Sequence, residues 1–103
     1  MSGRLRLHEA LTEIMEGVGE VYYQPPPSVH LNYPCIVYTK TRIQKLAADN
    51  RSYRLYSMFE VTVMDRDPDS TLPDRVMELP YSEYDRHYTS GQLHHDIINI
   101  YCV

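Results

Sequence analysis

Three aspartates at alternating positions are the first residues of this chain that suggest chemistry. Asp65, Asp67 and Asp69 have the one-three-five spacing that opens a calcium-binding loop. The rest of that pattern is missing, because Ser70 stands where a glycine would allow the sharp turn and Val76 stands where a bidentate glutamate would close the site. We therefore interpret the aspartates as turn and helix-capping residues, and we expect no metal at this loop.

A second group of possible ligands is rich in histidine. In a C-terminal β-hairpin, His87 and His94 would lie on adjacent strands near the turn, whereas the neighbours His94 and His95 would point to opposite faces. That leaves too few ligands for a structural zinc ion, which takes four. We therefore interpret these histidines as residues at a solvent-exposed edge of the sheet or at an interface. A small metal-dependent hydrolase is the alternative from a different class, and it would use His87, His94 and Asp96.

Other catalytic motifs are weak or missing. Ser57 and Cys35 lie in strand-like segments without an elbow motif, and the four glycines form no phosphate-binding loop. We therefore expect no enzyme and no cofactor. Cys35 and Cys102 have no CxxC partner, so we predict free thiols rather than a disulfide.

The composition limits the class of protein. With 103 residues, the chain is expected to form one domain over 1–103. Its net charge of −4 argues against a surface that grips phosphates, although DNA could still slide past it. No apolar run is long enough to span a membrane, and the N-terminus lacks the apolar core of a signal peptide, so we expect an intracellular protein. Ten tyrosines against one phenylalanine favour an oligomer, since tyrosine suits interfaces.

The elements that would position these residues follow from hydrophobic periodicity. Apolar residues at helical spacing predict a helix over 4–16, and a second helix should follow Asp69 or Ser70, bury Leu72, Val76 and Leu79, and stop at Pro80. Strands are expected over 21–23, 34–43, 53–64, 84–88 and 93–101, with a polar hairpin loop over 44–52. This order predicts an α+β fold, with a mainly antiparallel sheet, two helices on one face and a long protruding β-hairpin.

Several segments resemble one family. They are Tyr33 to Tyr38 (YPCIVY), Val63 to Ser70 (VMDRDPDS), Tyr84 to Tyr88 (YDRHY) and the C-terminal stretch from Leu93 to Tyr101. They are similar to segments of small neck proteins of long-tailed bacteriophages, the tail terminator, tail completion or minor capsid proteins. The resemblance implies an α+β sandwich like the tail terminator of phage lambda, with no catalytic residues.

The same resemblance implies a role in the virion, at the junction of tail and head. A ring, typically a hexamer, would cap the tail tube protein, end tube polymerisation and offer its other face to the head connector. DNA would pass through a negative lumen without specific binding. Sequence does not separate this role from that of a head-closure or head-tail adaptor component. A cytosolic adaptor that binds peptides along its sheet edge is a third possibility.

The middle hairpin supplies the candidate contact residues. Its arms are locally basic, which suits either a solvated edge or an arm that docks on a neighbour. The predicted contacts to other subunits or to the tube are Gln44, Lys45, Asp49, Asn50, Arg51, Tyr53, Arg54 and Tyr56. The predicted channel-lining residues are Glu60 and Asp67.

Overall fold

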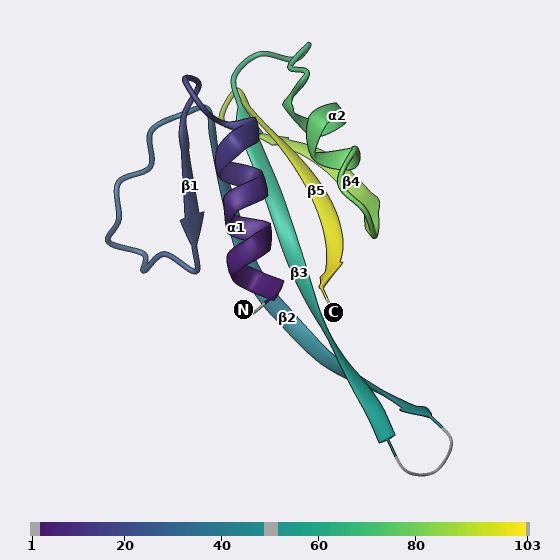
Figure 1. Cartoon of the computed structure of the whole chain (residues 1–103). Helices are drawn as coiled ribbons and strands as arrows, with labels where there is room; N and C mark the ends of the chain where they lie inside the picture. The colour runs from purple at the N-terminus through teal and green to yellow at the C-terminus, as the bar shows by residue number, and fades with distance from the viewer. Residues whose placement is uncertain (1–2, 49–51, 103) are drawn as a thin grey trace.

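The computed structural model describes residues 3–48 and 52–102, and it has two helices and five strands in these ranges (Figure 1). In chain order the elements are α1 (Gly3–Ile14), β1 (Glu20–Tyr23), β2 (Cys35–Ala48), β3 (Ser52–Asp65), α2 (Leu72–Met77), β4 (Ser82–Ser90) and β5 (Leu93–Cys102). The predicted α+β class and the order of elements are therefore confirmed.

The five strands form one mixed sheet in the order β1-β2-β3-β5-β4. Three of its four pairings are antiparallel: β2 with β3, β3 with β5, and β4 with β5. A mainly antiparallel sheet was predicted. The exception is β1, which runs parallel to β2 from the pair Glu20 and Cys35 onwards. The prolines after β1 predict only an extended connector, and the direction in which that connector returns to the sheet is decided by packing.

Both helices pack on the same face of the sheet, as predicted (Figure 1). Phe59, Val61 and Val63 of β3 share one face of the sheet and are buried against the helices. This burial removes apolar surface from water and is the main force that holds the layers together. The other buried side chains of this core are Leu7, Leu11, Ile14, Met15, Ile36, Tyr38, Leu72, Val76, Ile98 and Ile100.

The largest error of the sequence prediction concerns the loop over 44–52. Strand β2 continues to Ala48 and β3 begins at Ser52, so most of the predicted loop is paired strand. Polar side chains do not prevent strand pairing where neither face has to be buried, which is why composition misplaced this boundary. The second helix is also shorter than predicted, since it ends at Met77. Leu79 lies beyond the helix but still packs, partly buried, against the core.

Candidate functional site

Five residue pairs of β2 and β3 form an extension beyond the rest of the sheet. Strand β3 pairs with β5 only from Ser57 onwards. The pairs from Gln44 with Tyr56 to Ala48 with Ser52 therefore connect β2 and β3 alone. We call residues 44–48 and 52–56 the two-stranded extension. Figure 1 shows it running beyond α1 and the body of the sheet, and the molecule measures 50 × 25 × 23 Å as a result.

Two large apolar side chains are exposed where this extension leaves the body. Ile43 is 56% exposed and Leu55 is 53% exposed. The register pairs Ile43 with Ser57 and Leu55 with Lys45, which places both apolar side chains on the face that the helices cover elsewhere. They are diagonal neighbours on that face. An exposed apolar pair at this position is suited to contact with another protein.

A β-bulge separates the body of the sheet from this exposed segment. The pairing register of β2 shifts between Lys40 and Arg42, so Thr41 is the additional residue. Its hydroxyl donates a hydrogen bond to the backbone carbonyl of Met58 at 3.2 Å. A bulge increases local twist, so it sets the direction in which the extension leaves the sheet.

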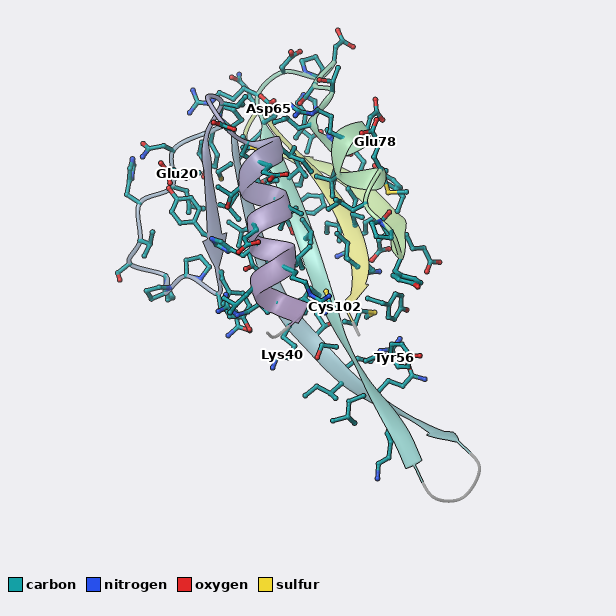
Figure 2. The ribbon with its side chains drawn as sticks, viewed as in Figure 1. Glu20, Lys40, Tyr56, Asp65, Glu78 and Cys102 are labelled. Carbon is teal, nitrogen blue, oxygen red and sulfur yellow. The ribbon has the colours of Figure 1, made fainter. Side chains whose placement is uncertain are left out.

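The structure spreads the predicted contact residues over the extension rather than gathering them. Gln44 and Lys45 are exposed, and Tyr56 is half-buried and pairs with Gln44. Figure 2 labels Tyr56 close to the point where the extension leaves the body of the sheet. For Tyr53 and Arg54 the structure gives strand backbone in β3. The predicted contacts Asp49, Asn50 and Arg51 lie outside the described residues.

The two predicted channel residues are not brought together. Glu60 is half-buried and pairs with Thr39 and Asn99, on the face of the sheet opposite the helices. Asp67 is exposed in the turn after β3, at the end of the sheet opposite the extension. They therefore form no common charged surface within one chain.

The three aspartates after β3 serve the turn. A carboxylate oxygen of Asp65 accepts a hydrogen bond from the backbone N–H of Asp67 at 3.0 Å, and Asp67 accepts one from Asp69 at 2.9 Å. The Ser70 hydroxyl then accepts the backbone N–H of Leu72 at 3.2 Å, at the start of α2. The two carboxylate bonds confirm the turn role of the aspartates. The predicted helix cap at Asp69 or Ser70 was wrong, because the N-cap of α2 is Thr71, which makes no side-chain capping hydrogen bond.

The histidine-rich hairpin is assembled as the sequence predicted. Adjacent strands bring His87 Nε2 and His94 Nδ1 to 3.4 Å, and His87 Nδ1 lies 3.0 Å from an Asp96 carboxylate oxygen. The Tyr84 hydroxyl donates to that same oxygen at 2.7 Å, and this bond raises the pKa of Tyr84 to about 12. His95 lies on the other face, as predicted.

This cluster is not a closed metal site. Within residues 3–48 and 52–102 there is no group of three or more His, Cys, Asp or Glu side chains arranged to hold a metal ion. His87 is 44% exposed and lies on β4, the last strand of the sheet. The prediction of histidines at a solvent edge is confirmed for this residue.

Sequence reasoning missed an apolar groove between α1 and the segment after α2. It has a volume of about 270 Å³ and is lined by Arg6, Leu7, Ala10, Leu79, Pro80, Tyr81 and Cys102, among others. At its rim, Tyr81 is 69% exposed and has a φ of 61°, a left-handed conformation that is unusual for an aromatic residue. No local pattern predicts this groove, because its walls come from three separate parts of the chain.

Both cysteines are free thiols, as predicted. Cys35 is buried, and the loss of water around it raises its thiol pKa to about 11. Cys102 is half-buried in the wall of the groove, where burial also raises its pKa. Neither thiol has the lowered pKa that activates a nucleophilic cysteine.

Across residues 3–48 and 52–102, no helix has the length and apolar character needed to cross a membrane. No model of a protein family matches the chain, and no curated protein is significantly similar to it.

Proposed function

We propose that this protein is a structural component of the neck of a long-tailed bacteriophage. As a tail terminator, it forms a ring that caps the tail tube, ends tube polymerisation and joins the tail to the head connector. The ring is closed: each subunit uses two different surfaces, and the rotation between subunits leaves no free edge. The family resemblance of the sequence is the reason for naming this particular assembly.

The observation that carries the proposal is the two-stranded extension. A pair of strands without a third strand or a covering helix is only marginally stable in water. Here Ile43 and Leu55 are exposed on one face where this pair leaves the body of the sheet. Contact with a neighbouring subunit would bury this apolar surface and stabilise the strand pair at the same time.

The apolar groove supplies a candidate surface for the other side of the interface. It lies between α1 and the Leu79–Pro80–Tyr81 segment. A head-to-tail ring needs two different complementary patches on each subunit. The exposed apolar pair Ile43 and Leu55 and the apolar groove are two such patches. A net charge of −4 per chain would let DNA pass through the lumen without tight binding.

Mass measurement of the purified protein tests the ring. Native mass spectrometry and light scattering should detect a closed oligomer, expected to be a hexamer, either alone or after addition of tail tube protein. Negative-stain electron microscopy should then show annular particles, and rings at the end of each tube. A strict monomer at all concentrations, with and without tube protein, would rule out this function.

Particles that lack the protein separate the terminator from a head-closure component. Loss of a terminator should give overlong tubes, because nothing ends polymerisation. Loss of a head-closure component should give tails of normal length that fail to join filled heads. The order of neighbouring genes gives independent information, since tail-tube and tape-measure genes are expected downstream of a terminator.

A further inference from the structure

We propose that His87 and His94 bind one divalent transition-metal ion near the turn of the β4–β5 hairpin. The ion belongs to the class that imidazole nitrogens prefer, namely Zn²⁺, Ni²⁺ or Cu²⁺. Asp96 acts as a positioning residue for His87. This proposal does not depend on the neck function, and it involves no hydrolysis.

Strand pairing places the site on one face of the hairpin. The register pairs His87 with Asp96 and Thr89 with His94, and directly paired residues share a face. Asp96 is in turn paired with the buried Val63 of β3, so the cluster lies on the same face as the core. Two histidines on adjacent strands are thus held side by side by backbone hydrogen bonds.

The distances match those of ligands that share one ion. Tetrahedral zinc has Zn–N distances of about 2.0–2.1 Å, which places two ligand atoms about 3.3–3.4 Å apart. His87 Nε2 and His94 Nδ1 are separated by 3.4 Å. The Thr89 hydroxyl oxygen lies 3.4 Å from His87 Nε2 and 3.3 Å from His94 Nδ1, so the three atoms form a nearly equilateral triangle.

The hydrogen bonds around His87 direct one nitrogen towards the site. Its Nδ1 lies 3.0 Å from the Asp96 carboxylate, so a neutral ring donates Nδ1–H there and keeps a lone pair on Nε2. The Tyr84 hydroxyl donates to the same carboxylate oxygen and fixes its position. A histidine held by a carboxylate on its second nitrogen is the common arrangement in metal sites.

The open surface defines the kind of site. Two histidines leave coordination positions for water or for a group from a neighbouring molecule, so binding should be weaker than at a closed four-ligand site. Ca²⁺ and Mg²⁺ require several oxygen ligands and should not bind. In the absence of an ion, His94 Nδ1–H can donate to His87 Nε2, so a simple hydrogen bond is the competing explanation for the short distance.

Metal titration of the full chain without a polyhistidine tag tests the proposal. Isothermal calorimetry with Zn²⁺ or Ni²⁺ alone should give one site per chain, and Mg²⁺ should give none. His87→Ala and His94→Ala should each abolish this site. His95→Ala is the matched control, because it removes an adjacent histidine from the opposite face, where the ring stacks on Tyr88 at 4.4 Å. It should bind as the wild type does.

Two further measurements separate metal binding from a structural role of the histidines. Asp96→Asn should weaken the affinity about 10- to 100-fold while the fold is retained by circular dichroism. In NMR spectra, Zn²⁺ should shift the ring signals of His87 and His94 and leave those of His95 in place. Wild-type affinity equal to that of His87→Ala, or equal loss in His95→Ala, would overturn the proposal.

Discussion

Replacing the exposed apolar pair at the base of the extension is the sharpest test of how the chain assembles. The double variant Ile43→Ser/Leu55→Ser removes both side chains from the face on which they are exposed. Because each side chain is more than half exposed, at 56% and 53%, the isolated subunit should lose little stability. Surface changes of this kind usually alter the free energy of unfolding by less than about 0.5 kcal/mol.

The expected loss of association follows from the exposed fractions. Burying a whole Leu or Ile side chain stabilises by about 1.5–3 kcal/mol, so burying the remaining half contributes about 1 kcal/mol for each residue. The pair therefore contributes about 2 kcal/mol at each interface. This corresponds to roughly a 30-fold change in the association constant of each interface, because about 1.4 kcal/mol is tenfold.

Light scattering over a dilution series measures this change directly. The double serine variant should dissociate at a concentration at least tenfold above that of the wild type, with an unchanged urea midpoint. The double variant Val18→Ser/Val29→Ser is the matched control, since these valines are 45% and 37% exposed on segments outside the extension. Assembly of the Ile43/Leu55 variant at wild-type concentrations, or an equal defect in the control, would refute this account of the interface.

Three further predictions concern the fold. Tyr38→Phe removes the hydroxyl that lies 2.6 Å from His8 Nδ1, so it should cost about 1–2 kcal/mol and lower the Tm by roughly 5–10 °C in calorimetry. Burial raises the pKa of Cys35 from 9.0 to about 11, so the unfolded chain releases this proton first. The contribution of the Cys35 thiol to the free energy of unfolding should therefore be complete below pH 9 and fall towards pH 11. The urea midpoint of Cys35→Ala should fall less steeply over this pH range than that of the wild type. Gly19→Ala places a Cβ against the Pro34 carbonyl oxygen, so it should destabilise by at least about 1–3 kcal/mol in urea titration; no loss would show that the backbone there can move freely.

Several parts of the fold could be predicted from sequence because local rules decide them. The alternation that buries Phe59, Val61 and Val63 is a property of any strand with one covered face. The aspartate turn also follows from local chemistry, since short carboxylate side chains accept nearby backbone N–H groups. His94 and His95 were assigned to opposite faces because successive side chains of a strand alternate between the two faces of the sheet.

Other features depend on the rest of the molecule. The prediction of a loop was wrong over 44–48 and at Ser52, because strand pairing there is set by the register of β2 and β3 and not by hydrophobicity. The rest of the predicted loop lies outside the described residues. The parallel pairing of β1 depends on where the proline-rich connector returns to the sheet. The candidate metal site needed distances between side chains, which the sequence pattern does not contain.

The sequence by itself determined the α+β class, the inward face of β3, the acidic turn and the neighbouring positions of His87 and His94, because each depends on residues close in the chain or on one hairpin. Only the tertiary structure decided that the extension stands apart from the helices with Ile43 and Leu55 exposed, and that an apolar groove lies beside α1. The groove forms where α1, the segment after α2 and β5 pack together, and the extension forms where β2 and β3 continue beyond β5. Their geometry is fixed by packing over the whole chain.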